Sequence, residues 1–316
     1  MKVCHLTSVH PHTDTRIFIK ECQSLAKVGY EVHLVAPGAP DSFVDGVNIH
    51  GVKKETGSRL KRMTKTVNRV YEKGLEIDAD VYHFHDPELI PVGLKLKKIG
   101  KKVIYDVHED VPRDILSKHW LPFAIRQPVS KVFEKYENYA AKKFDFIVGA
   151  TPFITERFKK INDNTININN YPLLNELNYS EENINRFSQK IVCYVGGVTT
   201  IRGIKQLIKA ADFINGKIEI AGPIASKDIE KNIRSRNNVN YLGVLERSKV
   251  KELLARSMGG LITFLPEPNH INAQPNKMFE YMSAGIPVIC SDFPLWRKIV
   301  EENKCGICVN PEDPIE

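Results

Sequence analysis

Two series of short apolar segments, each segment followed by a helix-like pattern, run along almost the whole of this 316-residue chain. The first series lies within residues 2–150 and the second within residues 191–309. Such an alternation of buried strands and helices is typical of a parallel, doubly wound sheet. Residues 173–188 are polar and acidic and show neither the two-residue period of a strand nor the 3.6-residue period of a helix. The sequence therefore predicts an α/β fold with a domain at 1–172, a linker at 173–188 and a second domain at 189–316.

The expected strands can be placed by their apolar runs. Those of the first domain are 2–9, 31–36, 47–52, 81–84, 102–107 and 146–150, and those of the second are 191–195, 217–221, 239–242, 260–265, 286–290 and 306–309. In doubly wound sheets, ligands bind beyond the carboxyl ends of the strands. Functional residues are therefore expected just after these segments.

Six cysteines are scattered through the chain, most of them inside apolar segments. A reduced thiol behaves there as a small hydrophobic group, which favours a reducing, cytoplasmic compartment. Cys305 and Cys308 have the spacing of half a zinc site, but the sequence holds no second pair of this kind. No run of about 18 apolar residues, the length that a membrane span requires, occurs in the sequence. We expect a protein that is soluble or peripheral to a membrane.

The net charge of +7 is concentrated in the first domain, where residues 1–170 hold 27 Lys and Arg against 21 Asp and Glu. Within it, residues 59–73 combine apolar residues at helical spacing with the basic residues Lys61, Arg62, Lys65 and Arg69. Such a helix can lie on an anionic membrane surface, or it can be solvated with its apolar stripe in the core. Nucleic-acid binding is not expected, because aromatic residues are not interleaved with the basic ones.

Polar and charged residues follow three strands of the first domain. Arg16 lies near an expected helix start, where it could hold an acceptor phosphate or carboxylate, unless the loop is only a capped helix start. Histidines and carboxylates after the strands at 81–84 and 102–107 are possible ligands of a catalytic zinc: His83, His85, Asp86, His108, Glu109 and Asp110. We expect no metal, because we expect His83 and His85 to point to opposite faces of their strand.

The segment 275–292 predicts a helix, a turn and a buried strand. Pro275 opens the helix and Gly285 ends it. The N-terminus of a helix presents free N–H groups and the positive end of the helix dipole, which favour a bound anion. Lys277 lies in this first turn, where its charge is unfavourable unless an anion binds. Asn276 and Glu280 share one face of the helix.

A glycine pair follows the strand at 191–195. Gly196 and Gly197 allow backbone N–H groups to approach a phosphate, and Arg202 lies just before the next helix. A glycine pair alone is a weak signal. Combined with Lys277, it predicts a phosphate-binding site.

The residues at 275–289, Pro-Asn-Lys-Met-Phe-Glu-Tyr-Met-Ser-Ala-Gly-Ile-Pro-Val-Ile, resemble the donor-binding signature of the retaining GT-B glycosyltransferases of family 4, in which two glutamates are spaced E-x7-E. By this resemblance, Glu280 matches the second glutamate, which receives the two ribose hydroxyls of the sugar nucleotide. Asn272 stands in place of the first, which contacts the donor sugar. Gly197 and Arg202 stand in place of two cations that hold the diphosphate, and His108 matches a histidine beside the donor sugar.

The resemblance implies the GT-B fold, in which two Rossmann-like domains face each other across a cleft. It also implies an enzyme that moves a sugar, with retention, from a UDP- or GDP-sugar to a glycan or lipid-linked acceptor in polysaccharide or cell-envelope glycan biosynthesis. No cofactor or metal is implied. Family members continue into C-terminal helices beyond the position of Glu316, so a second domain without these helices is one expectation.

Two other functions stay open. One is a sugar-nucleotide epimerase of GT-B fold, which shares the donor cleft but has no acceptor surface. The other is a non-catalytic nucleotide-sugar-binding partner in a membrane synthesis complex, which the absence of a carboxylate at Asn272 favours.

Overall fold

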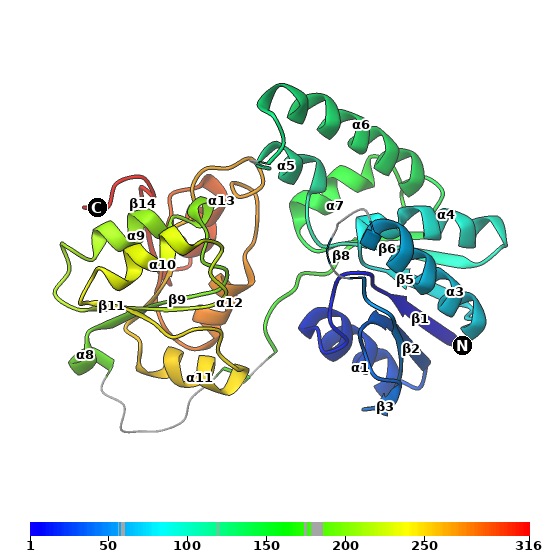
Figure 1. The fold of residues 1–316 in the computed structure, drawn as a ribbon, viewed down its shortest axis with the longest axis horizontal. Coiled ribbons are helices and arrows are strands. Elements are labelled where there is room, and N and C mark those ends of the chain that lie inside the picture. The colour runs from blue at the N-terminus through cyan, green and yellow to red at the C-terminus, as the bar shows by residue number, and fades with distance from the viewer. Residues whose placement is uncertain (56, 58–60, 119, 174–175, 178–185) are drawn as a thin grey trace. The chain divides into compact units, whose positions relative to one another are not determined.

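A computed structural model gives the fold of residues 1–316 and describes all of them except 56, 58–60, 119, 174–175 and 178–185. The chain divides into two compact units, Met1–Asn170 (unit 1) and Tyr171–Glu316 (unit 2) (Figure 1). Most of the predicted linker, and the start of the predicted basic helix at Arg59 and Leu60, lie outside the described residues.

Unit 1 is built on an eight-stranded sheet with the order β3-β4-β2-β1-β5-β6-β7-β8 (Figure 1). The neighbouring strands are parallel, except for the antiparallel edge pair of β3 and β4. Along β2, Val35 packs in one apolar cluster while Leu34 and Ala36 pack in another, so both faces of the sheet are covered. The strands are β1 (Lys2–Leu6), β2 (Glu31–Pro37), β3 (Ser42–Val44), β4 (Val47–Val52), β5 (Val81–Phe84), β6 (Lys102–Val107), β7 (Phe146–Gly149) and β8 (Thr165–Asn167).

The helices of unit 1 begin with an eight-residue π-helix, η1 (Thr15–Cys22). Asp14 caps it, because its side chain accepts hydrogen bonds from the backbone N–H groups of Arg16 and Ile17 at 2.9 and 3.0 Å. π-helices are rare and are found frequently at functional sites. The other helices are α1 (Gln23–Lys27), η2 (Arg62–Thr66), α3 (Val67–Ile77), η3 (Pro87–Leu89), α4 (Ile90–Lys98), α5 (Val111–Leu116), α6 (Phe123–Ala141) and α7 (Pro152–Lys159).

Unit 2 holds a six-stranded parallel sheet with the order β11-β10-β9-β12-β13-β14 (Figure 1). On β9, Cys193 and Tyr194 belong to two different apolar clusters, so this sheet is also covered on both faces. The strands are β9 (Ile191–Val195), β10 (Lys217–Ala221), β11 (Val239–Tyr241), β12 (Gly259–Ile262), β13 (Val288–Ser291) and β14 (Gly306–Val309). The helices are α8 (Arg186–Gln189), η4 (Thr200–Arg202), α9 (Ile204–Ala210), α10 (Lys227–Arg234), α11 (Arg247–Arg256), α12 (Asn276–Ser283) and α13 (Pro294–Val300).

The doubly wound α/β fold predicted from the sequence is confirmed, and several strands, such as β5, β6 and β9, have the predicted bounds. The expected strand at 286–290 is shifted, because Ile286 and Pro287 belong to the turn after α12 and β13 begins at Val288. Pro275 is the residue before α12 rather than its first residue, with an extended ψ of 130°. The elements β3, α5, α7 and β8 were not predicted; each has only three to eight residues, too few for a clear period.

Candidate functional site

The turn after β9 brings two cations close to the backbone of two glycines. Gly196 has φ of 136°, which favours glycine, and a Cβ built on it would lie 2.7 Å from Nζ of Lys277. A Cβ on Gly197 would lie 2.9 Å from Nη1 of Arg202. A side chain at either position would displace a cation. The glycine pair found in the sequence is therefore what allows Lys277 and Arg202 to reach this turn.

Lys277 is buried in the first turn of α12, with 8% of its surface exposed. Its Nζ lies 3.8 Å from the ring centroid of Tyr194 and 5.2 Å from that of Phe264. Among the described residues, Nζ has no hydrogen-bond acceptor. Burial, followed by the positive charge of Arg202, holds the pKa of Lys277 well below its usual range. The free protein therefore keeps a buried amine ready for a negative charge that it does not itself supply.

Helix α12 is fixed on the sheet by the residue that follows Glu280. The hydroxyl of Tyr281 accepts a hydrogen bond from the backbone N–H of Val195 at 3.0 Å. The Tyr281 ring lies against Gly260 of β12, where a Cβ would come within 2.1 Å of it. These contacts hold the start of α12 next to the glycine turn after β9.

Glu280 lies on the half-exposed side of α12 and accepts a hydrogen bond from Nη1 of Arg247 at 2.8 Å. Arg247 also donates from Nε to Glu176 at 2.6 Å. The sequence does not predict Arg247 or Glu176 as part of the site, because they lie 33 and 104 positions before Glu280 on other segments. Asn272 lies in the turn before α12 and Asn276 is the exposed first residue of the helix.

In unit 1, His108 follows β6 and is held by a buried ion pair. Its Nε2 lies 2.9 Å from Oδ2 of Asp106, and Arg16 donates to the same carboxylate from Nε at 2.9 Å and from Nη2 at 2.8 Å. Burial would raise the pKa of Asp106, but the charges of His108 and Arg16 and the hydrogen bonds hold it well below its usual range. In the tautomer of His108 whose Nε2–H donates to Asp106, Nδ1 is left as an acceptor for a sugar hydroxyl.

Arg16 is 4% exposed and donates also from Nη1 to the carbonyl oxygen of Ile168 at 3.0 Å. Its role as an acceptor site stays a prediction. In the structure, its guanidinium is engaged by the protein itself, where it positions Asp106.

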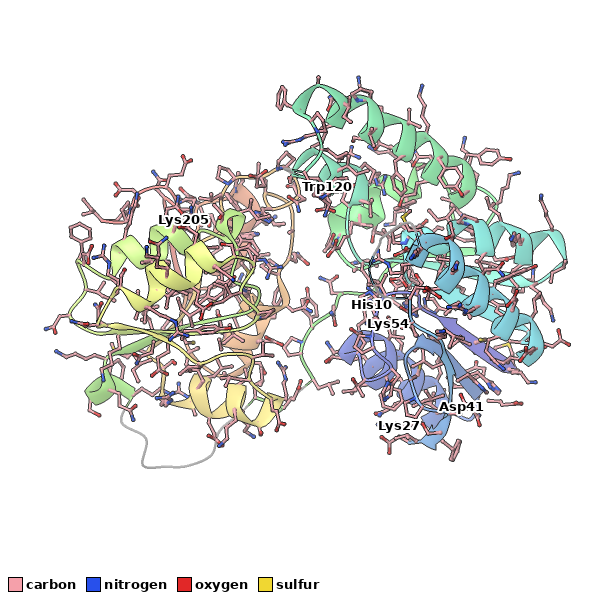
Figure 2. The ribbon with its side chains drawn as sticks, viewed as in Figure 1. His10, Lys27, Asp41, Lys54, Trp120 and Lys205 are labelled. Atoms are coloured by element: carbon pink, nitrogen blue, oxygen red, sulfur yellow. The ribbon has the colours of Figure 1, made fainter. Side chains whose placement is uncertain are left out.

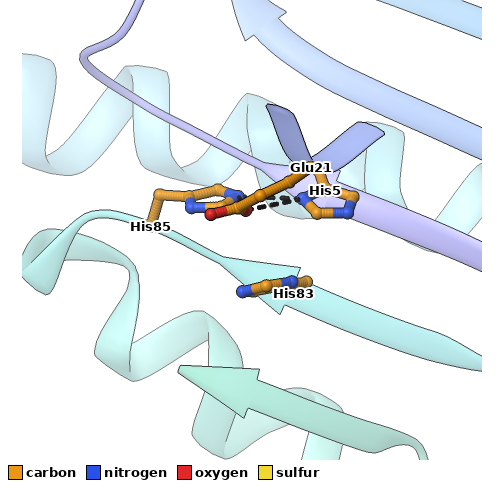
Figure 3. Close-up of side chains that lie close together, drawn as sticks. All are labelled: His5, Glu21, His83 and His85. Atoms are coloured by element: carbon orange, nitrogen blue, oxygen red, sulfur yellow. Dashed lines mark hydrogen bonds and ion pairs between the residues drawn. The ribbon is translucent and has the colours of Figure 1, made fainter. Parts of the chain in front are cut away.

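The expectation that His83 and His85 point to opposite faces of β5 is wrong. Residues two apart on a strand share a face, and the two rings are stacked with centroids 4.7 Å apart. His5 on β1 joins them, with Nδ1 2.9 Å from Nε2 of His85 (Figure 3). Burial lowers the pKa of His83 to about 3 and holds that of His5 well below its usual range. Burial on this face of the sheet therefore disfavours the charged form of these imidazoles.

The predicted basic helix corresponds to η2 and α3. Its apolar side packs into the core, since Val67 and Val70 are 7% and 0% exposed. Arg62 pairs with Glu88 at 3.1 Å and Arg69 with Glu55 at 2.6 Å. Lys61 and Lys65 are exposed. Val67 and Val70 are therefore not available to a membrane, whereas Met63, which is 51% exposed, and part of the basic side are available.

A second surface of unit 1 was not predicted. Helix α6 exposes apolar side chains at alternating steps of four and three residues, which line one side of a helix: Ile125, Val129, Val132, Tyr136 and Tyr139. Trp120, labelled in Figure 2, precedes the helix and is 61% exposed. We call these six residues the α6 stripe. In the described part of the chain, no helix has the length and apolar character needed to cross a bilayer.

Several solved structures have a similar fold. Sucrose-phosphate synthase of Thermosynechococcus elongatus has a TM-score of 0.77 at 16% identity, over 99% of this chain and 86% of its own. HepE of Anabaena, solved with UDP and glucose, has a TM-score of 0.72 at 16% identity, over 100% of this chain and 87% of its own. WaaG, a glycosyltransferase involved in lipopolysaccharide biosynthesis, has a TM-score of 0.73 at 15% identity, over 99% of this chain and 87% of its own. These likenesses show a fold of the GT-B class, as the sequence predicts.

The sequence comparisons narrow this class. Residues 16–167 match the family model Glycosyltransferase Family 4, and residues 189–316 match the model Glycosyl transferases group 1. An uncharacterized glycosyltransferase of Methanocaldococcus jannaschii is 26% identical over 99% of this chain and 86% of the relative. The chain belongs to glycosyltransferase family 4, which confirms the predicted family, fold class and enzyme class.

Proposed function

We propose that this enzyme transfers a sugar, with retention, from a UDP- or GDP-sugar to a glycan or lipid-linked acceptor at the cytoplasmic side of a membrane, in polysaccharide or cell-envelope glycan biosynthesis. The observation that carries the proposal is the buried amine of Lys277, which lacks an acceptor among the described residues and lies beside Arg202 at the start of α12. A diphosphate supplies the negative charge that this arrangement lacks.

The reaction breaks the bond between the sugar C1 and the diphosphate oxygen and forms a bond from C1 to an acceptor oxygen, whose proton passes to the leaving diphosphate. Charge stabilisation on the leaving group is the main requirement. Lys277, Arg202 and the backbone at Gly196 and Gly197 would provide it without a metal at the diphosphate. By family likeness, Glu280 receives the ribose hydroxyls, and the remaining donor contacts fall to Asn272, Asn276 and His108.

A screen of sugar nucleotides tests the proposal. UDP-sugars come first, because the similar HepE was solved with UDP-glucose. We expect one nucleotide sugar to raise the thermal midpoint and to be slowly hydrolysed without added Mg²⁺ or Mn²⁺. An epimerase would convert the donor sugar without needing an acceptor, and a non-catalytic partner would bind the donor without hydrolysis. Absence of stabilisation by every UDP- and GDP-sugar contradicts the proposal.

Exchange of Glu280 for glutamine is expected to weaken binding of the nucleoside diphosphate. An amide accepts less well than a carboxylate that receives two hydroxyls, at a cost of roughly 1.5–3 kcal/mol, or about 10- to 150-fold in Kd. Calorimetry with UDP and GDP measures the change. Glu176→Gln is the matched control, since it alters the same Arg247 but no proposed ribose contact. Equal affinities of wild type and Glu280→Gln remove Glu280 from the donor site.

An anionic membrane surface is the proposed partner of unit 1. Lysines are exposed around the α6 stripe at Lys131, Lys135, Lys142 and Lys143. Both acidic residues of α6 are engaged with arginines instead, Glu134 with Arg113 and Glu137 with Arg157. An apolar and aromatic stripe on a helix with several exposed lysines matches anionic lipid, whereas a second copy of the same stripe would bring these lysines together. The basic residues of η2 and α3 would add to this attraction.

Two sets of substitutions should weaken vesicle binding in different ways. Exchange of Lys61, Arg62, Lys65 and Arg69 for Gln removes about 1 kcal/mol of attraction per residue and reduces the salt dependence of binding. Exchange of Ile125 and Val132 for Gln weakens binding but keeps the salt dependence. Sedimentation with anionic vesicles across a salt series measures both, and Val244→Gln, an exposed position of unit 2, is the control. Wild-type protein that stays in the supernatant at low salt contradicts the membrane proposal.

A further inference from the structure

Four side chains with metal-binding atoms meet on one face of the unit 1 sheet: His5 of β1, His83 of β5, His85 directly after β5, and Glu21 of η1 (Figure 3). The three histidines are 0–8% exposed, and Glu21 is half-buried above them. One ligand atom from each residue lies within 4.8 Å of the others. The π-helix η1 is what brings Glu21 to the two strands, since it carries this residue on the side that faces the sheet.

Three of these atoms form a triangle of suitable size for a metal ion. Nδ1 of His5 and Nε2 of His85 are 2.9 Å apart, and each lies 3.8 Å from Oε2 of Glu21. The point equidistant from all three lies about 2.1 Å from each, which is the length of Zn–N and Zn–O bonds in proteins. His83 approaches from below this triangle in Figure 3, with its ring centroid 4.6 Å from that of His5. It supplies the fourth ligand after a rotation of its ring.

Protein contacts do not satisfy this cluster. Nε2 of His5, Nε2 of His83 and Oε2 of Glu21 are buried and have no hydrogen-bond partner among the described residues. Buried polar atoms are nearly always paired, and several orphans in one place indicate an absent ion or water. The only hydrogen bond between the histidines of the cluster that the described residues show joins His5 to His85.

Carboxylate and guanidinium groups behind the cluster orient two of its members. Nδ1 of His85 lies 3.2 Å from Oδ2 of Asp106, so a carboxylate orients the imidazole whose Nε2 faces the cluster. Oε1 of Glu21 lies 3.1 Å from Nε of Arg16, which leaves Oε2 for the cluster. Carboxylate–histidine–metal arrangements of this kind fix the tautomer and the ring orientation of a ligand.

We propose that His5, Glu21, His83 and His85 bind one divalent transition-metal ion, with zinc favoured by three nitrogen ligands and one oxygen ligand. Four protein ligands leave no open position, so the ion is structural and joins η1 to β1 and β5. The prediction of no metal rests on the family resemblance and on the expectation that His83 and His85 point to opposite faces, and the structure corrects the second of these grounds. The site lies within unit 1, and the proposal does not depend on the donor site of unit 2.

Metal content of the full chain tests this inference. Protein expressed with added zinc, then dialysed against buffer without chelator, is expected to hold about one Zn²⁺ per chain by elemental analysis and native mass spectrometry. Co²⁺ exchanged into the wild type is expected to give the visible absorption of a four-coordinate site. Removal of the ion should lower the thermal midpoint, and added ZnCl₂ should restore it.

Matched variants locate the ion. His83→Gln should weaken zinc binding at least about 10-fold. His33→Gln is the matched control and should leave zinc binding unchanged. His33 also has a histidine and a glutamate beside it, since its Nδ1 lies 2.9 Å from Nε2 of His50 and its Nε2 lies 3.0 Å from Oε1 of Glu31. Wild-type protein that holds no zinc and gives no Co²⁺ absorption overturns the inference and leaves water as the occupant; this outcome does not depend on whether a variant folds. If His83→Gln still holds one Zn²⁺ per chain with the affinity of the wild type, the ion binds elsewhere and the inference is also overturned.

Discussion

Exchange of Lys277 for methionine is expected to lower turnover by about 100-fold at saturating donor, the effect of removing one preorganised charge from the leaving group. Methionine keeps the length and the apolar stem of the side chain, which packs against Tyr194 and Phe264. Because burial already disfavours the charged form in the free protein, the exchange should leave the stability of unit 2 little changed. Arg202→Met, which removes the second cation of the same turn, is expected to have a similar effect.

Steady-state hydrolysis and transfer rates measure the change, with Lys209→Met on the exposed side of α9 as the control. Retention of wild-type turnover by both Lys277→Met and Arg202→Met removes the two cations from the site. A second readout is the pH dependence of UDP or GDP binding. A bound diphosphate is expected to raise the pKa of Lys277 back towards its usual value. At a pH between the pKa of the free protein and that of the complex, binding therefore takes up a proton. The affinity of the wild type should fall as the pH rises through this range. Calorimetry in buffers of different ionisation enthalpy detects the proton, which Lys277→Met should lack.

The sequence predicted the parts of the site that depend on local pattern. The glycine pair after a buried strand and the lysine in the first turn of α12 are neighbours in short motifs, and the structure places Gly196, Gly197, Arg202 and Lys277 together. Alternation of strands and helices was sufficient to predict the doubly wound fold, since the central strands of both sheets have clear apolar runs, although the short strands β3 and β8 do not.

The missed features depend on contacts between distant segments. Arg247 reaches Glu280 from α11, and no spacing rule connects the two. The π-helix η1 has the composition of an ordinary amphipathic helix, and only its packing shows that Glu21 joins the histidines of β1 and β5. Arg16 was interpreted as a ligand site because its partner Asp106 is 90 positions away. The error on His83 and His85 was different, because the two-residue period of a strand already places both on one face.

Exchange of Asp106 for asparagine is expected to have the largest effect on stability. Asp106 is fully buried and accepts two hydrogen bonds from Arg16, while His85 and His108 lie at 3.2 and 2.9 Å from its Oδ2. The neutral amide keeps the shape but removes the carboxylate that receives two hydrogen bonds from the buried guanidinium of Arg16, which is then left with the carboxylate of Glu21, at 3.1 Å from its Nε. Loss of one partner of a buried ion pair costs about 3–5 kcal/mol. Asp106→Asn should therefore lower the free energy of unfolding of unit 1 by this amount.

Urea unfolding measures this loss, and the chain offers an internal reference. Of the two tryptophans, Trp296 is buried in unit 2, so its fluorescence follows unit 2 while circular dichroism follows both units. We expect Asp106→Asn to shift the dichroism transition of unit 1 and to leave the Trp296 transition in place. Asp78→Asn is the matched control, because Asp78 is 77% exposed and pairs with Lys101 on the surface, where a pair contributes about 0–1 kcal/mol. If both variants unfold at the wild-type urea concentration, the Arg16–Asp106 pair does not stabilise unit 1. Arg16→Met and the double variant test whether the two residues act together. If each of the three variants lowers the free energy of unfolding by the same amount, Arg16 and Asp106 act as one unit that holds His108 and His85 in place.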